Sequence, residues 1–373
     1  MRRRWSVGAL ASALALGAGG LSAQTSQPAA VAADGWRPLF DGRSLDGWHR
    51  VGGAATFEVR EGMIVGSTTT GQPNAFLRTD VEYGDFELEL DVWIDPALNS
   101  GIQIRSHVRP KSGRVYGLQV EVDPSDRAWS GGIYDEARRG WLADLADAPA
   151  AREAFRGGGT WNHYRVRCVG AEILTWVNGE PAARLLDGVD LTGFIALQVH
   201  GIGKDEAKAG RPVRWRNVRI RELGRHAWRP LWNGRNLAGW VSVGDGFAVE
   251  DGVLIGSGVA ALVATPGAGA RGLRLRLGAV RGAGAAVAFG GAWAGTGPMQ
   301  GGTRLALPDG DGPLACTLVV NALGETAAWL DDQRTELAPL ASGADELGSV
   351  ALVLGADTEV RVQALEQLVP VRR

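Results

Sequence analysis

The sequence predicts an all-β protein built from two tandem β-sandwich domains, and three features support this prediction. Segments along the chain alternate apolar and polar residues with a period of two, which is typical of half-buried strands in antiparallel sheets. The 55 glycines provide for many tight turns, and only residues 136–145 indicate a short helix. At 373 residues, the chain is long enough for two domains with separate cores. Many short strands with glycine-rich turns favour a sandwich or jelly roll.

A long internal repeat divides the chain into the two predicted domains. Two blocks recur in the same order and at nearly constant spacing: residues 36–48 (WRPLFDGRSLDGW) at 228–240 (WRPLWNGRNLAGW), and residues 57–67 (FEVREGMIVGS) at 247–257 (FAVEDGVLIGS). Repeats this far apart indicate duplication of a whole domain rather than a solenoid. We therefore expect one sandwich over residues 35–224 and a degenerate second copy over residues 227–369.

The expected strands of the first domain follow one another with the same alternation. They cover residues 86–94, 101–107, 116–123, 163–170, 173–184, 194–200 and 213–223. Asn178-Gly179 lies between two strand-like runs and indicates a hairpin turn. The second domain repeats the series with fewer polar residues, at 273–280, 285–292, 303–312, 328–336 and 349–355.

The N-terminus has the pattern of a secretory signal. Three arginines at 2–4 precede the short apolar segment 7–21, and the small residues before Gln24 form a cleavage site. We expect a signal peptide over residues 1–23 and a flexible tether over 24–34, which places the mature protein in the periplasm or outside the cell. The sequence leaves general secretory and twin-arginine export as alternatives. Beyond the signal, the sequence predicts no transmembrane segment.

Composition argues against several classes of partner. The 39 basic and 41 acidic residues nearly balance, and the arginines are dispersed, so no nucleic-acid partner is predicted. The two cysteines, Cys168 and Cys316, fall on apolar phases of expected strands and are predicted to be buried core thiols. The sequence predicts no cofactor, and a divalent metal stays an open alternative.

Three predicted strands of the first domain place polar side chains on one face. The pairs that share a phase are Gln103 with Arg105, Gln119 with Glu121, and Gln198 with His200. The second domain has AAVAFGGA, TRLALPD and VALVLG at the corresponding places, so the fold does not require these polar residues. If the strands are neighbours, amides, a carboxylate, an arginine and an imidazole line a concave face. Such a face suits sugar hydroxyls and proton transfer.

Arg105, Glu121 and His200 are the candidate catalytic residues, and each has a structural alternative. Arg105 would hydrogen-bond a substrate carbonyl or hydroxyl, or else form a surface ion pair. Glu121 would be a base or a hydroxyl acceptor, or else the cross-strand partner of an arginine. His200 would transfer protons, or else be held at a strand end. The candidate substrate-binding amides are Gln103, Gln119 and Gln198.

The segment 129–141 (WSGGIYDEARRGW) is aromatic and charged, and the second domain has no equivalent. We interpret it as a rim or lid over the predicted site. Trp129, Tyr134 and Trp141 would stack on a sugar ring, and Asp135, with its neighbour Glu136, would bind hydroxyls. The structural alternative is packing over the edge of the sandwich.

Seven blocks of the first domain carry a resemblance to a known family. They are LFDGRSLDGW (39–48), NSGIQIRS (99–106), GGIYDEARRGWL (131–142), WNHYRVRC (161–168), WVNG (176–179), IALQVHG (195–201) and VRWRNVRIREL (213–223). In this order they resemble the 3-keto-disaccharide hydrolase domain family. The resemblance implies a concanavalin-like jelly roll, an oxidised 3-keto-glycoside as substrate, and a partner oxidoreductase that makes the 3-keto sugar.

From the substrate that the resemblance implies, we infer a hypothetical mechanism for cleaving the glycosidic bond. A ketone at C3 acidifies the C2 proton, which His200 or Glu121 would remove, while Arg105 stabilises the enolate. The aglycone then leaves C1, and water adds to the resulting enone. The main alternative is a non-catalytic carbohydrate-binding module of the cell envelope, because jelly-roll faces often bind glycans without cleaving them. A structural or adhesive envelope protein is a third possibility.

Overall fold

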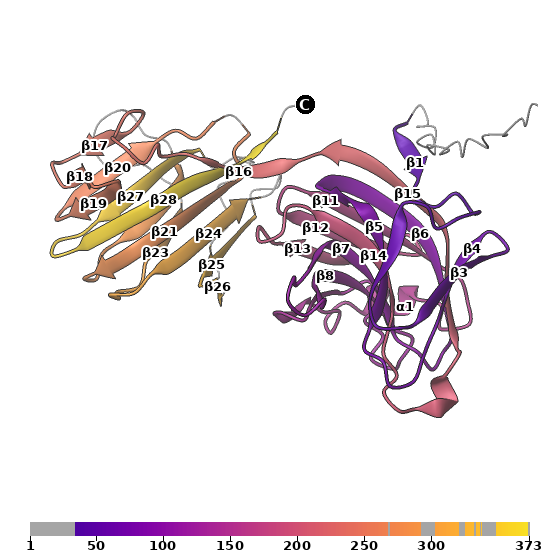
Figure 1. The fold of residues 1–373 in the computed structure, drawn as a ribbon. Coiled ribbons are helices and arrows are strands. Elements are labelled where there is room, and N and C mark those ends of the chain that lie inside the picture. Colours follow the sequence, from indigo (N-terminus) through magenta and orange to yellow (C-terminus); the bar gives the residue numbers. More distant parts are fainter. Residues whose placement is uncertain are drawn as a thin grey trace, which may run out of the picture.

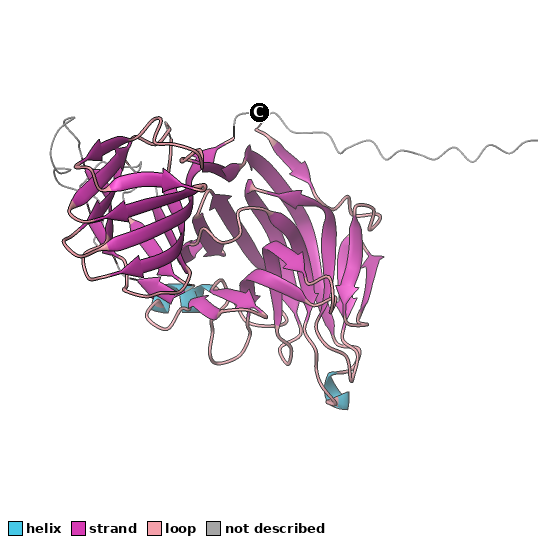
Figure 2. Cartoon of the chain, turned by 60° about the vertical axis from the view of Figure 1, so that its left-hand side comes forward, coloured by secondary structure: helices cyan, strands magenta, loops and turns pink. Residues whose placement is uncertain are grey.

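The computed structural model describes residues 34–267, 269–291, 303–320, 325–331, 333–335, 337 and 348–371. The predicted signal peptide, and the predicted tether up to residue 33, lie outside the described residues. Strands β1–β28 dominate the described chain, and the two helices, α1 (Pro149–Ala154) and η1 (Glu206–Lys208), are short (Figure 2). The predicted all-β jelly-roll class is confirmed. No helix among the described residues is long and apolar enough to span a membrane.

The first sandwich consists of an eight-stranded and a seven-stranded antiparallel sheet (Figure 1). The eight-stranded sheet runs β13 (Glu180–Leu186), β12 (Glu172–Val177), β11 (Asn162–Val169), β6 (Asp85–Ile94), β15 (Pro212–Gly224), β4 (Met63–Ser67) and β3 (Thr56–Arg60), with β1 (Trp36–Pro38) also on β15. The seven-stranded sheet runs β10 (Gly140–Ala143), β9 (Ile133–Glu136), β8 (Val115–Val122), β7 (Ser100–Val108), β14 (Gly193–Val199), β5 (Ala75–Tyr83) and β2 (Trp48–Gly52).

The second sandwich repeats this strand order with a smaller second sheet. Its eight-stranded sheet runs β26 (Gln333–Thr335), β25 (Thr326–Leu330), β24 (Leu314–Val320), β21 (Gly272–Arg281), β28 (Glu359–Pro370), β19 (Val253–Ser257) and β18 (Phe247–Glu250), with β16 (His226–Pro230) on β28. Its five-stranded sheet runs β23 (Thr303–Ala306), β22 (Ala286–Gly291), β27 (Ser349–Leu354), β20 (Ala260–Ala264) and β17 (Val241–Val243). Residues 307–313, all described, are the whole link between β23 and β24, so that stretch holds no counterpart of the β9–β10 hairpin.

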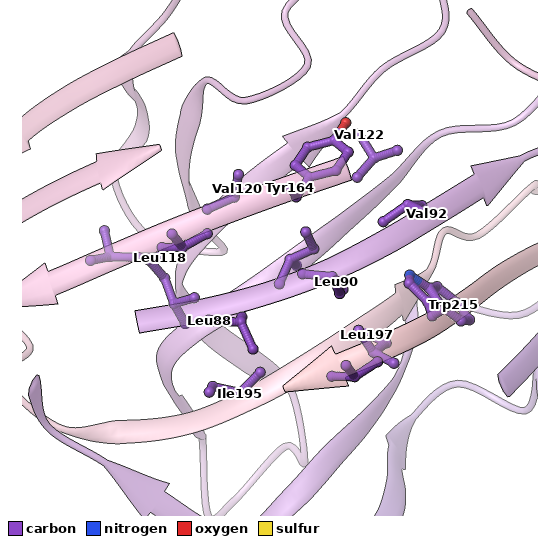
Figure 3. Packing of buried hydrophobic residues seen from close by; sticks show 14 of the residues in the cluster. Leu88, Leu90, Val92, Leu118, Val120, Val122, Tyr164, Ile195, Leu197 and Trp215 are labelled. Carbon is purple, nitrogen blue, oxygen red and sulfur yellow. The ribbon is translucent and has the colours of Figure 1, made fainter. Parts of the chain in front are cut away.

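Alternation along the strands builds the core of the first sandwich. Leu88 and Leu90 of β6 are fully buried and face Leu118 and Val120 of β8 between the two sheets, as Figure 3 shows. Trp215 of β15 closes the same layer and is also fully buried. Burying such side chains stabilises the fold by roughly 1.5–3 kcal/mol each. The core therefore uses one face of the seven-stranded sheet and leaves the opposite face, here called the outer face, for other chemistry.

Two predictions about local features can be compared with the structure directly. The predicted helix over residues 136–145 is wrong, because residues 140–143 form β10 and pair back on β9. Positive φ angles at Ala137 and Gly140 turn the chain between those strands, and the helix α1 instead begins at Pro149. Cys168 and Cys316 are free and buried, as predicted, and burial raises the pKa of the Cys168 thiol to about 11.

The two sandwiches meet at a joint where β15 leads almost directly into β16 (Figure 1). His226 of β16 bonds through Nδ1 to a carboxylate oxygen of Asp85 in β6, at 2.6 Å. An apolar cluster joins side chains of both halves, including Leu186 and Leu191 of the first with Val319 and Trp329 of the second. The joint is therefore packed and hydrogen-bonded, and Asp85 is its buried charged centre.

Candidate functional site

A chain of amides forms the floor of the site on the outer face of the seven-stranded sheet. Gln119 Oε1 accepts hydrogen bonds from Gln103 Nε2 at 2.7 Å and from Gln198 Nε2 at 2.9 Å. Gln119 Nε2 donates in turn to Glu121 Oε2 at 3.0 Å. A Cβ on Gly101 would lie 2.3 Å from the Gln119 amide carbon, so glycine at this position leaves room for the network. The predicted placement of these four polar residues on one face is what the structure shows.

Glu121 is the carboxylate of this floor and is only 4% exposed. One of its oxygens accepts from Asn99 Nδ2 at 2.7 Å and from Arg127 Nη2 at 3.0 Å. Burial raises the pKa of Glu121, and the bonds from Asn99 and Gln119 and the charge of Arg127 only partly oppose it. A carboxyl group with a raised pKa is suited to exchange protons near neutral pH.

An aromatic wall stands beside Glu121. Trp141 of β10 packs edge-on against Trp129 and Tyr134, with ring centroids 4.8 and 5.2 Å apart. The Arg127 guanidinium lies over the Trp141 ring, 4.9 Å from its centroid, and also binds Asp123 through Nε at 2.7 Å. The β9–β10 hairpin and the turn before it thus place rings and a guanidinium next to the amide floor.

Two further titratable groups, His200 and Glu136, line the same pocket. His200 Nδ1 lies 2.8 Å from the carbonyl oxygen of Gly201. A carbonyl oxygen only accepts hydrogen bonds, so Nδ1 is the donor in this contact and Nε2 is the ring nitrogen left to exchange a proton with a ligand. Burial raises the pKa of Glu136, against the charges of Arg114 and His200.

Together these groups enclose a polar pocket of about 410 Å³. It is lined by Asn74, Asn99, Gln119, Glu121, Arg127, Tyr134, Glu136, Trp141 and His200. Another hollow, of about 550 Å³, lies on the eight-stranded sheet beside Asp91 and His163. There Asp91 already accepts hydrogen bonds from His163, Arg216 and Asn217. The polar side chains of this hollow are thus bonded to one another. The polar pocket is therefore the better candidate for chemistry.

The structure does not bring Arg105 to the polar pocket. A bulge in β7 after Ile104, with φ of +45° at Arg105, breaks the alternation that placed Arg105 beside Gln103. The fully buried side chain instead donates to the carbonyl oxygens of Gly84 and Gly170, at 2.9 and 2.6 Å, and to Asp85 at 3.1 Å. Arg105 thus belongs to the buried joint, and Arg127 is the guanidinium at the pocket.

Of the predicted substrate-binding residues, Gln103 and Gln198 are fully buried and do not line the pocket, and Asp135 and Trp129 also lie outside its lining. Asp135 is fully buried and binds Arg138 through Nε at 2.8 Å, as well as Arg139, so it anchors the hairpin. Trp129 supports Trp141 from the side. Glu136, predicted with Asp135 to bind hydroxyls, does line the pocket and shares the phase of Tyr134 on β9. Asn74, Asn99 and Arg127 lie outside alternating segments, so no periodicity pointed to them.

The fold and the pocket define a carbohydrate-active β-sandwich protein. Residues 35–221 match the model of the 3-keto-alpha-glucoside-1,2-lyase-like domain, and the chain belongs to this family. The predicted family is thereby confirmed for the first domain. Among curated proteins no match was found. Among the described residues, no group of three or more His, Cys, Asp or Glu side chains is arranged to hold a metal ion.

Several solved structures are similar to about half of this chain. A protein from Parabacteroides distasonis, named as a predicted glycosyl hydrolase, is 21% identical with a TM-score of 0.38, covering 51% of this chain and 95% of that one. The carbohydrate-binding module CBM66 from Bacillus subtilis is 13% identical, with a TM-score of 0.33 and coverage of 46% and 94%. A Bacillus subtilis protein with a galectin-like fold is 12% identical, with a TM-score of 0.38 and coverage of 50% and 94%.

Proposed function

We propose that the first sandwich cleaves the glycosidic bond of 3-keto-glycosides by elimination followed by addition of water. The observation that supports this most is the gathering of His200, Glu121 and Glu136 around one polar pocket. A C3 ketone acidifies the C2 proton, so this cleavage needs a base, an acid and a stabilised enolate. It does not need the two carboxyl groups that flank the bond in ordinary glycosidases.

In the proposed first step, His200 Nε2 removes the C2 proton. Its lone pair is free, whereas Glu121 already accepts hydrogen bonds from Asn99, Gln119 and Arg127. The electrons of the C2–H bond form an enolate with the C3 carbonyl. Arg127 and Asn99 replace Arg105 in the role of stabilising the charge that develops, because they border the pocket.

In the second step the C1–O bond breaks and its electron pair leaves with the aglycone oxygen. Glu136 supplies the proton to that oxygen, since burial raises its pKa and keeps more of the acid form. Water then adds to the C1=C2 bond. Glu136 takes a proton from the water as its oxygen binds C1, and His200 returns a proton to C2. The sum is hydrolysis, and both side chains end in their starting states.

Hydrogen–deuterium exchange at C2 separates the two steps. We expect His200→Ala to abolish both C2 exchange in D₂O and aglycone release. Glu136→Gln should keep C2 exchange but slow release by about 10²–10⁴-fold. His163→Ala is the matched control, because His163 lies on the other sheet and pairs with Asp91. Full activity of His200→Ala, beside an unchanged control, would contradict the assignment of the base.

The proposal includes a location and a partner. We propose that the protein is exported by its N-terminal signal and meets its substrate in the periplasm or outside the cell. An oxidoreductase would supply the 3-keto sugar, because the reaction begins from a ketone that ordinary glycosides lack. Protease protection of the protein in intact cells, and its loss on permeabilising the outer membrane, would test the location.

A carbohydrate-binding module is the second candidate function. The observation that favours it is the aromatic wall beside an amide floor, since Trp141 and Tyr134 can stack on sugar rings while Gln119 binds hydroxyls. Binding of unoxidised glycans without turnover of the 3-keto form would favour this function over catalysis.

A further inference from the structure

A second, more apolar chamber adjoins the polar pocket. Its volume is about 600 Å³, and its lining combines the apolar Pro73, Phe76 and Val115, the last two almost fully buried, with the polar Asn74, Ser112, Arg114 and Glu136. Residues 112–114, between β7 and β8, form its rim. Asn74 and Glu136 line both the chamber and the polar pocket, so the two hollows meet at these side chains.

The chamber rests on an apolar cluster that is separate from the sandwich core. Phe76, Val115, Phe194 and Ala196 are buried together there. Cross-strand partners put these residues on the outer face, because Ala196 lies opposite Gln103, a residue of the amide floor. The outer face of the seven-stranded sheet therefore has two regions. It is polar over β7, most of β8 and the end of β14, and it is apolar beside β5 and at the start of β8.

We propose that this chamber is the aglycone subsite and that it selects a small apolar or aromatic aglycone. The inference rests on the proposed function, because it assigns the sugar to the polar pocket. Hydroxyls need the amides and carboxylates, whereas an apolar group gains from leaving water against Phe76, Val115 and Pro73. The chamber is less suited to a second sugar than the polar pocket is, because fewer of its lining residues carry polar side chains.

The position of Glu136 supports this orientation of the substrate. Glu136 borders both hollows, so a substrate that spans them places its glycosidic oxygen beside this carboxyl group. That oxygen is the atom that must receive a proton when the C1–O bond breaks. Asn74 accepts from the backbone N–H of Gly201 through Oδ1 at 2.9 Å, which fixes the boundary between the two hollows next to His200.

Two 3-keto-glucosides with leaving groups of equal reactivity test the subsite. The 2-phenylethyl and ethyl compounds both release a primary alcohol, so a difference between them reports binding rather than bond strength. We expect kcat/KM for the 2-phenylethyl compound to be about tenfold higher or more. The 3-keto-glucoside of 2-(2-hydroxyethoxy)ethanol is the control for binding of the phenyl ring. Its aglycone is a polar chain of similar length, so its kcat/KM should be close to that of the ethyl compound.

Substitutions at the rim localise the effect. Ser112→Trp puts a bulky side chain on an exposed rim residue of the chamber, and we expect it to lower kcat/KM for the 2-phenylethyl compound about tenfold more than for ethyl. Lys111→Trp is the matched control, because Lys111 is exposed in the same turn but does not line the chamber. Phe76→Leu should weaken the preference several-fold while keeping an apolar residue in place.

The outcomes separate failure of the subsite from failure of the proposed function. Equal kcat/KM for both compounds, unchanged by Ser112→Trp, would overturn the subsite and leave the reaction in place. If neither compound is cleaved, the proposed function fails. The subsite is then judged by equilibrium binding of the unoxidised 2-phenylethyl and ethyl glucosides. Tighter binding of the former, lost in Ser112→Trp but kept in Lys111→Trp, supports the chamber, and equal binding overturns it.

Discussion

The outer faces of the two smaller sheets differ far more than the strands that carry them. In the first sandwich, β7, β8 and β14 present Gln103, Gln119 and Gln198 as a bonded network. In the second, the corresponding β22 and β27 present a small buried apolar cluster that contains Ala288 and Ala351. Since the strand order is the same in both, the fold needs neither the amides nor the carboxylate. The polar set of the first sandwich is therefore best explained by function.

The two sandwiches also differ in the segment that follows β8 in the first and its counterpart β23 in the second. The first sandwich adds β9 and β10 to its smaller sheet, and these bring Tyr134, Glu136 and Trp141 to the pocket. In the second sandwich, residues 307–313 lead from β23 into β24 without such a hairpin. The comparison predicts that activity depends on the amide floor and the hairpin together, and that it is absent from the second sandwich.

After the loss expected for His200→Ala, the largest effect should come from removing the charge of Glu121. We expect Glu121→Gln to lower the rate of aglycone release by about 10²–10⁴-fold, because the carboxylate holds Arg127 and Asn99, the proposed enolate-stabilising groups, in the pocket. The control is Glu250→Gln on β18 of the second sandwich, an exposed position that should leave the rate unchanged. Equal activity of both variants would mean that the polar face of the first sandwich is not the site.

The two arginines should separate stability from activity. Arg105→Ala removes a buried guanidinium that binds Asp85 and two backbone carbonyl oxygens, and should reduce the free energy of unfolding by about 3–5 kcal/mol even though His226 still binds Asp85. Arg127 is partly exposed beside Glu121, so Arg127→Ala should lower activity with a smaller loss of stability. Denaturant unfolding and aglycone release on the same preparations measure both. If Arg105→Ala instead lowered activity with little loss of stability, Arg105 rather than Arg127 would have the functional role.

The joint between the sandwiches should respond to acid. Burial opposes ionisation of Asp85, but the hydrogen bond and charge of His226 and the charge of Arg105 outweigh it and lower the pKa of Asp85. A lowered pKa contributes stability that is present above the ordinary carboxyl pKa and is lost as the pH falls through the folded-state value. Asp85→Asn should therefore lose about 2 kcal/mol at pH 7 and little at the lowest pH. A loss independent of pH would contradict this.

A smaller effect should follow from adding one methyl group beneath the amide floor. A Cβ at residue 101 would meet the Gln119 amide carbon at 2.3 Å, so Gly101→Ala should displace Gln119 and cost about 1–3 kcal/mol. On β21 of the second sandwich, a Cβ at Gly278 would meet only the mobile end of Gln363, at 3.1 Å. Gly278→Ala should thus change the melting temperature less. Similar changes in melting temperature in both variants would show that the packing of Gln119 against Gly101 is not tight.

Strict alternation explains how far the sequence could predict the site. A period of two placed Gln103, Gln119, Glu121 and Gln198 on one face, because regular strands leave no other arrangement. It failed at Arg105, where a bulge with a positive φ angle reverses the side chain. Such a bulge at a non-glycine residue leaves no mark in composition.

The hairpin shows a second limit of sequence patterns. Residues 136–145 mix charged and apolar residues in a way that suggested a helix, but the turn between β9 and β10 falls there. Because the strand was not predicted, Asp135 and Glu136 received the same role, whereas alternation on β9 turns Glu136 to the pocket and Asp135 to Arg138 and Arg139. Tertiary pairing with β8 decides the structure of this segment, and no local preference encodes it.

The most direct test of the central claim is release of the aglycone from a 3-keto-glucoside beside the unoxidised glucoside, in both anomeric forms. We predict that the wild-type protein cleaves only the keto compound and that His200→Ala abolishes this cleavage. Cleavage of both compounds at similar rates would contradict the elimination route, because only the ketone acidifies the C2 proton. Cleavage of neither would contradict the catalytic function and leave a sugar-binding domain.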